Sequence, residues 1–323
     1  MEINVEILLI ILLTLWLFTS VLVIIEKKVL RMILWFFMWS MIGAIAFFLL
    51  GSPDVAMAEA AISSFSTIVF IICFEKFFDI RDVGRQRIDE EEINQESKIR
   101  RYVVPGLVTV VLLGLFIYFI PSAEYNPYLK ELYLASFRHD VGGYNVITSI
   151  ILGYRLYDTL FEALMLVVAV VAVMHMSHTG EITIPDGKHS DIEKSNLANL
   201  LLRTIAPITI VFGIYVIGNG FLTAGGGFQG GLAIASFFVC RFLIYDIYDL
   251  PIEKVNKLEE MVFVLIVVVA AATIFQGAID LVPAVHRATV QNIYLIIMNS
   301  LVGLKVACGF IILFYRYTAI ERN

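Results

Sequence analysis

The residue that stands out first is a lysine inside an apolar segment. Lys305 lies near the middle of residues 293–315, a run long enough to cross a bilayer. A lysine at that depth costs about 2.5–3.5 kcal/mol on insertion scales, so we expect its side chain to face protein or water instead of lipid. Ionisable groups at membrane depth are typical of proteins that move ions or protons, or of subunits that neutralise a partner's charge.

Acidic residues stand in similar surroundings after Gly51. Pro53 and Asp54 suit the first turn of a helix, where a fixed backbone and a negative charge are favoured. Glu59 follows about one and a half turns inside that helix, among alanines and serines that permit close helix packing. Two interpretations are open for Glu59: a place in an ion path or charge network, and a buried acid with satisfied hydrogen bonds. Asp54 and Glu59 both enter the set of candidate ion-translocation residues.

A second acidic pair begins a later apolar segment. Asp158 and Glu162 are four residues apart and therefore share a helix face, and we expect both to be buried. Two acids at this spacing repel unless a cation or a base lies between them, and Arg155 is the local candidate. Carboxylate oxygens suit hard cations such as sodium. A structural ion pair and a functional cation site both fit the pattern.

Five glycines fall within seven residues between two apolar segments: Gly225, Gly226, Gly227, Gly230 and Gly231. Their spacing formally matches the dinucleotide-binding pattern G-x-G-x-x-G, but that pattern needs a preceding strand, and apolar spans flank it here. We expect instead a backbone held against neighbouring helices, or a loop that enters the membrane. A helix that begins near Phe228 would offer free amide groups to a polar or anionic group.

The cysteines do not form a metal-binding pattern. Cys73, Cys240 and Cys308 lie far apart, and no C-x-x-C occurs, which argues against iron–sulfur and zinc sites. We therefore expect no cofactor and no metal site. No basic stripe or fold motif indicates nucleic-acid binding.

The elements that must position these residues are membrane helices. Of the 323 residues, 59% are hydrophobic and 16% are charged, against roughly 25% charged in soluble proteins. We expect an all-α, multi-pass protein of the cell membrane. Nine spans are expected, at about 5–25, 30–50, 55–76, 102–120, 156–175, 203–219, 228–248, 259–280 and 292–315.

The distribution of basic residues predicts the orientation of these spans. When the loops are assigned alternately to the two sides, 18 of the 23 Lys and Arg residues fall on one side and 4 on the other, with Lys305 inside a span. Cytoplasmic loops carry the excess of Lys and Arg. The N-terminus is therefore expected outside and the C-terminus in the cytoplasm.

Two polar stretches, 79–100 and 178–199, divide the chain into three blocks at 1–78, 101–177 and 200–323. They are either ordinary loops or linkers between units that could exist as separate polypeptides. No internal repeat is visible, which argues against the usual inverted-repeat carrier.

The blocks resemble, in order, parts of one family of membrane complexes. Residues 53–61 are similar to the C-terminal region of the A subunit of Mrp sodium/proton antiporters and to the D subunit of archaeal membrane-bound hydrogenases. Residues 145–147 and 154–162 resemble the next part of that A subunit, which is the E subunit of the hydrogenases. The run 225–231, with Asn219 upstream, resembles the signature of the Mrp B subunit, the hydrogenase F subunit.

The chain departs from the family pattern at two places. Ala224 stands where proline usually precedes the glycines, and Leu160 and Phe161 replace the more usual leucine–glycine before the glutamate.

The resemblance implies a subunit of a sodium/proton translocation module, in a stand-alone antiporter or in a hydrogenase-like or sulfur-reducing respiratory complex. Such a subunit would perform no redox chemistry of its own. Its partners would be other Mrp-like subunits, hydrogenase-like or complex I-like subunits, Na⁺ and H⁺, and membrane lipid. A scaffold subunit without an ion path and a self-sufficient carrier are the alternatives.

Overall fold

The computed structural model describes residues 5–77, 107, 109–111, 113–114, 127–176, 196–245, 250–279 and 284–319. Regular structure in these residues is helical throughout, without a strand. Six helices in the described residues are long and apolar enough to cross a membrane: Ile7–Ile25, Val29–Leu49, Pro53–Phe74, Leu156–Met176, Ile252–Phe275 and Thr289–Thr318. Two shorter apolar helical segments are Arg203–Asn219 and Gly227–Phe242. The described part of the chain therefore has the all-α class that its composition predicts.

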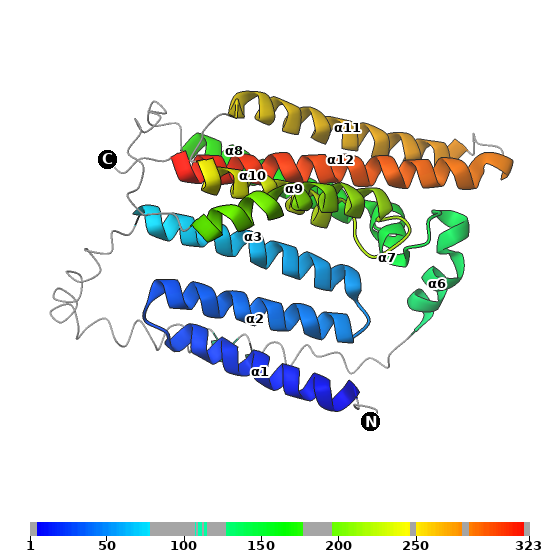
Figure 1. Cartoon of the computed structure of the whole chain (residues 1–323). Helices are drawn as coiled ribbons and strands as arrows, with labels where there is room; N and C mark the ends of the chain where they lie inside the picture. The colour runs from blue at the N-terminus through cyan, green and yellow to red at the C-terminus, as the bar shows by residue number, and fades with distance from the viewer. Residues whose placement is uncertain are drawn as a thin grey trace.

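The first three helices are α1 (Val5–Ile25), α2 (Val29–Leu49) and α3 (Pro53–Phe77). They lie in a row, with α1 packed on α2 and α2 on α3 (Figure 1). Gly43 lets α1 and α2 approach, because a Cβ there would lie 3.4 Å from the Trp16 indole nitrogen. Trp16 also stacks on Trp39, with ring centroids 5.3 Å apart. Helix α3 contacts α10 and α12 and so joins this row to the rest of the bundle.

Three short elements precede the next long helix: α6 (Tyr128–Asp140), α7 (Val146–Ser149) and the π-helix η1 (Ile150–Tyr154). Asn145 caps α7, because its side chain accepts hydrogen bonds from the backbone amides of Ile147 and Thr148. None of these elements is among those expected from the sequence, because each is too short to give a membrane-length apolar pattern. They lie together at one end of the bundle (Figure 1).

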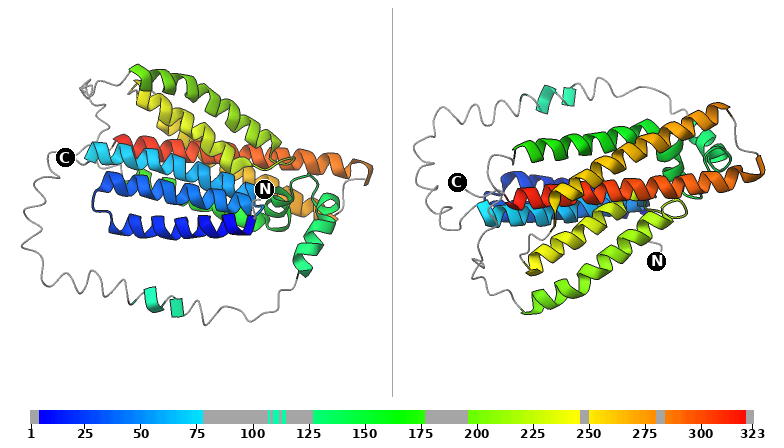
Figure 2. Two further views of the ribbon diagram at one scale, coloured as in Figure 1. Left: turned by 60° about the horizontal axis from the view of Figure 1, so that its bottom comes forward. Right: turned by 90° about the horizontal axis from the view of Figure 1, so that it is seen from above.

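The remaining helices are α8 (Leu156–Met176), α9 (Asn196–Asn219), α10 (Gly227–Tyr245), α11 (Ile252–Ile279) and α12 (Ala284–Ala319). Helix α12 is central, since it contacts α3, α8, α9, α10 and α11. Seen from above, α8 and α9 lie on opposite sides of α12 (Figure 2). The candidate ion-translocation residues therefore lie on α12 and on two helices that contact it, α3 and α8.

The described helices match the expected spans, except at their ends. Helix α11 begins at Ile252, before the expected start at 259, and α12 extends beyond 292–315 in both directions. The added ends of α11 and α12 carry polar residues, and a span predicted from apolar residues alone stops before them. Most of the expected span 102–120, and nearly all of the stretches 79–100 and 178–199, lie outside the described residues.

Candidate functional site

Lys305 forms a buried ion pair with an acid on the neighbouring helix. Its ammonium contacts the carboxylate of Glu259, and the two side chains are 0% and 1% exposed. The Lys305 Nζ also lies 5.5 Å from the centroid of the Phe263 ring, an arrangement that favours a cation. The structure confirms that Lys305 faces protein. It also identifies Glu259, which the sequence analysis missed because the expected span began at that residue.

Glu59 lies at the contact between α2 and α3. The hydroxyl of Ser40, itself buried, donates a hydrogen bond to the half-buried Glu59 carboxylate. Ser40 lies on α2 and Glu59 on α3, so the acid occupies a helical interface as the small residues around it predict. This contact leaves both interpretations of Glu59 open, because one hydrogen bond from a hydroxyl does not neutralise a carboxylate.

Asp158 and Glu162 are exposed on the surface of this chain, and the expectation that both are buried is wrong for the chain by itself. Helix α8 turns Leu156, Thr159 and Ala163 toward the bundle, and each acid lies one residue before a buried one, about 100° around the helix. Asp158 pairs with Arg155, the expected partner. Glu162 makes no hydrogen bond or ion pair with the described residues.

Asp54 belongs to a hydrogen-bonded joint between the three blocks. Its Oδ1 accepts from the side-chain amide of Asn145 at 2.9 Å and from the backbone amide of Gly225 at 3.0 Å. The same Asn145 amide group donates to the backbone carbonyls of Gly220 and Thr223. One buried asparagine therefore connects the start of α3, the start of α7 and the α9–α10 loop.

The glycine run lies against neighbouring helices. Helix α10 begins at Gly227, one residue before the expected start near Phe228, and the Gly227 amide donates to the side-chain oxygen of Asn299 at 3.2 Å. A Cβ on Gly227 would lie 2.5 Å from the Asn299 carbonyl oxygen, and a Cβ on Gly231 would lie 2.3 Å from that of Gly303. These distances are too short for any side chain. The run is thus a packing surface between α10 and α12, with no dinucleotide fold around it in the described residues.

The other glycines of the run serve the same contact region. Gly230 faces α9, where a Cβ would lie 2.6 Å from the Gly213 carbonyl oxygen. Gly225 has a φ of 136°, a conformation that side chains rarely adopt, and this turns its amide toward Asp54. Gly226 is buried beside Asn299.

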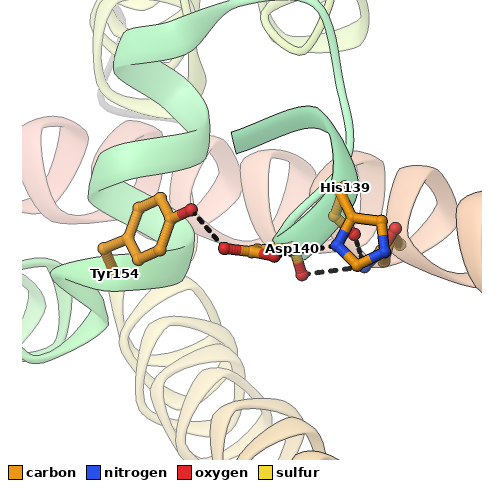
Figure 3. Close-up of polar contacts among 4 residues, drawn as sticks. His139, Asp140 and Tyr154 are labelled. Atoms are coloured by element: carbon orange, nitrogen blue, oxygen red, sulfur yellow. Dashed lines mark hydrogen bonds and ion pairs between the residues drawn. The ribbon is translucent and has the colours of Figure 1, made fainter. Parts of the chain in front are cut away.

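A polar cluster outside the membrane-length helices attaches α6 to the bundle. The Tyr154 hydroxyl donates to Asp140 at 2.8 Å, and His139 Nδ1 lies 3.0 Å from the other Asp140 oxygen (Figure 3). These hydrogen bonds lower the pKa of Asp140. Burial and the neighbouring carboxylate raise the pKa of Tyr154 to about 12. Gln291 of α12 donates to the backbone carbonyls of His139 and Asp140.

The candidate ion-translocation residues do not form one cluster. No hydrogen bond or ion pair joins Asp54, Glu59, Asp158, Glu162 or Lys305 to another of these five in the described part of the chain. The same part contains no group of three or more His, Cys, Asp or Glu side chains that could hold a metal ion. They lie in four distinct places: the joint between Asp54 and the α9–α10 loop, the α2–α3 contact, the exposed face of α8, and the α11–α12 pair.

Comparison with known proteins identifies two family segments. Residues 6–78 match the model for the D subunit of MBH, and residues 197–312 match the model for a domain related to the MnhB subunit of Na⁺/H⁺ antiporters. The chain is 24% identical over 125 residues to the putative antiporter protein mnhA2 of Staphylococcus saprophyticus, covering 39% of this chain and 14% of that protein. It is 25% identical over 141 residues to the A subunit of the Na(+)/H(+) antiporter of Bacillus subtilis, covering 42% of this chain and 16% of that protein.

A solved complex shares the fold over most of the chain. The structure of the Mrp complex from Dietzia sp. DQ12-45-1b matches with a TM-score of 0.64 at 20% identity, over 93% of this chain and 34% of that chain. With several membrane-length helices and these relatives, the protein is a multi-pass membrane protein. The chain thus joins in one polypeptide a block similar to the D subunit of MBH and a block similar to the MnhB subunit of Na⁺/H⁺ antiporters.

Proposed function

We propose that this chain is a subunit of a sodium/proton translocation module in which it carries part of the ion path. The observation that carries the proposal is the presence of ionisable side chains within membrane-length helices: Glu59 in α3, Glu162 in α8, and Lys305 with Glu259 at the α11–α12 contact. Charges at membrane depth are costly and mark ion or proton pathways by default. The similarity to antiporter subunits supplies the class of ion.

Within this function, Asp54, Glu59, Asp158, Glu162 and Lys305 are the proposed ion-path residues. Glu162 is open to neighbouring subunits, because it lies on the exposed face of α8 without a partner in the described part of the chain. The partners are the other subunits of an Mrp-like or hydrogenase-like complex. Any redox reaction belongs to those subunits, and this chain itself is non-catalytic.

The proposed topology has nine spans, an outer N-terminus and a cytoplasmic C-terminus. The 18-to-4 distribution of Lys and Arg supports it. The three blocks at 1–78, 101–177 and 200–323 are proposed to correspond to units that other complexes carry as separate subunits. The separate family matches at 6–78 and 197–312 support the first and last of these.

A scaffold role is the second candidate, and two contacts favour it. Lys305 is already paired with Glu259, and Asp158 with Arg155, so these charges are satisfied within the chain. A scaffold subunit would use them as interhelical or local bridges. Neutralising them would then reduce assembly of the complex without a separate effect on transport.

Glutamine substitutions test the proposal. Glu59→Gln and Glu162→Gln keep side-chain size and hydrogen-bonding capacity but remove the negative charge. In everted vesicles that contain the whole complex, we expect normal assembly on native gels and Na⁺-driven proton movement at least tenfold slower. Asp140→Asn, outside the membrane-length helices, is the control and should leave the rate unchanged. If both glutamine variants assemble and transport at the wild-type rate, these acids are structural.

A further inference from the structure

Glu259 is a completely buried acid that the similarity to other subunits does not assign. It lies on α11 and reaches Lys305 on α12, with both side chains out of contact with solvent. Its sequence neighbour Glu260 points the other way, is exposed, and accepts a hydrogen bond from Asn256. The adjacent acids therefore occupy opposite environments, and of the two only Glu259 enters the core.

Stability alone does not account for this pair. Removing two charges from water costs about as much as their attraction returns, and well-packed apolar residues of similar volume usually stabilise a protein as well or better. The surroundings could have held such residues, since Val262 and Ile266 on α11 are buried with apolar neighbours. A Lys–Glu pair at this place therefore points to a property that apolar side chains lack, which is the capacity to bind and release a proton.

We propose that Glu259 exchanges a proton with Lys305, so that the pair acts as a proton-transfer unit of the translocation module. In the exchange, the N–H bond of the Lys305 ammonium breaks and an O–H bond forms on the Glu259 carboxylate. The products are a neutral amine and a neutral carboxylic acid, so the total charge is zero before and after. The inference rests on the proposed function, because proton transfer between these two residues matters for transport only if an ion path runs through this chain.

The environment makes both forms of the pair accessible. Burial disfavours charged groups and so brings the neutral pair closer in energy to the ion pair than it is in water. The Phe263 ring near Nζ favours the ammonium and restores the ion pair. Within the described residues, the buried thiol of Cys308 is a further titratable group close to Lys305, one turn further along α12.

The position of Glu259 suits a proton that arrives from one side of the membrane. It lies seven residues after the start of α11, about 10 Å along the helix axis at 1.5 Å per residue. Lys305 lies fourteen residues, about 21 Å, before the end of α12. Both of these helix ends are on the proposed cytoplasmic side. Glu259 is nearer to the cytoplasmic end of its own helix than Lys305 is to the end of α12.

A neutral double variant tests the inference. Glu259→Gln with Lys305→Met removes both charges at nearly constant volume, so neither partner is left as an unpaired buried charge. In vesicles with the whole complex, we expect wild-type assembly and Na⁺-driven proton movement at least tenfold slower. The matched control is Glu26→Gln with Arg31→Met, which removes an ion pair near the α1–α2 turn and should leave the rate unchanged.

Wild-type transport by the assembled double variant would overturn the inference and make the pair a structural bridge. Should the double variant fail to assemble, Lys305→Arg decides, because arginine keeps the positive charge beside Glu259 but does not release its proton. An assembled complex that transports at least tenfold more slowly supports proton exchange, and transport at the wild-type rate contradicts it. The proposed function fails separately: it is wrong if Glu59→Gln and Glu162→Gln also transport normally.

Discussion

At the scale of single residues, the packing of the described helices depends on a few positions where only a particular charge or a particularly small residue fits. The Lys305–Glu259 pair sets the polar contact between α11 and α12. The glycines of α10 set the distance to α9 and α12, because backbone atoms of those helices occupy the space that a Cβ would need. The ion pair and the close glycine contacts thus involve different positions along the same central helix, α12.

Gly227→Val tests the volume constraint. The new side chain would meet the Asn299 carbonyl, the Val302 side chain and the Gly303 amide, so α10 and α12 must separate. Overpacking of this kind typically costs about 1–3 kcal/mol, and more where the contact is backbone. We expect a lower Tm of the purified protein and less assembled complex. Gly218→Val is the matched control, because no atom beyond its own stretch of helix lies within 4 Å of its Cβ position, and it should behave like wild type apart from helix propensity.

At the scale of elements, the short helices α6 and α7 determine how the long ones are joined. Asn145 does this by two separate means, since its oxygen caps α7 and its amide nitrogen reaches Asp54 and the α9–α10 loop. The backbone amides of Tyr144 and Asn145 add hydrogen bonds to the Phe221 carbonyl. The middle block is therefore fastened to both of the others at one end of the bundle.

Two substitutions of Asn145 separate these functions. Asn145→Asp keeps the capping oxygen but removes the donor and places a second carboxylate beside Asp54. Asn145→Ala removes both, with the cap alone worth about 0.5–2 kcal/mol. We expect both variants to lower the Tm. Hydrogen exchange should increase at α7 only in the alanine variant, and at the α9–α10 loop in both. Faster exchange at α7 in the aspartate variant would show that the joint, and not the cap, holds that helix.

The α6 attachment is expected to depend on pH. The folded-state pKa of Asp140 is lower than its ordinary value of 3.8 because of hydrogen bonds from His139 and Tyr154. A depressed pKa stabilises the folded form above pH 3.8, and this contribution is lost as the pH falls through the folded-state value. Hydrogen exchange at α6 should therefore accelerate below about pH 4. Tyr154→Phe removes one of the hydrogen bonds that lower the pKa of Asp140, so the pH range over which exchange at α6 accelerates should become narrower. If the pH dependence of this exchange is the same in the variant, Asp140 is not its cause.

At the scale of the whole molecule, the arrangement has to serve a membrane with two different sides. The described helices form one bundle around α12, and the first block reaches it through α3 (Figure 1). The proposed orientation places both polar stretches, 79–100 and 178–199, in the cytoplasm. Ion movement through such a subunit has one direction only if every copy of the chain has the same orientation in the membrane.

Cysteine labelling tests the orientation. Glu90→Cys, in a background without Cys73, Cys240 and Cys308, should react with an impermeant maleimide only after cells are permeabilised, because the stretch around it is proposed to be cytoplasmic. A cysteine at Tyr144, which is exposed and lies on the proposed outer side, serves as the positive control in intact cells. Labelling at position 90 in intact cells would reverse the topology.

The sequence by itself determined the helical class, most helix positions and the protein-facing environment of Lys305, because hydropathy and the cost of a charge in lipid are local properties. The density of glycines likewise indicated close packing of α10. Tertiary structure alone decided which partners these residues have. Glu259 meets Lys305 across 46 positions, and Asn145 joins Asp54 to a loop beyond residue 219, since such contacts depend on how helices are placed side by side. Rotation of α8 also exposed Asp158 and Glu162, because four-residue spacing fixes a shared face but not the direction in which that face points.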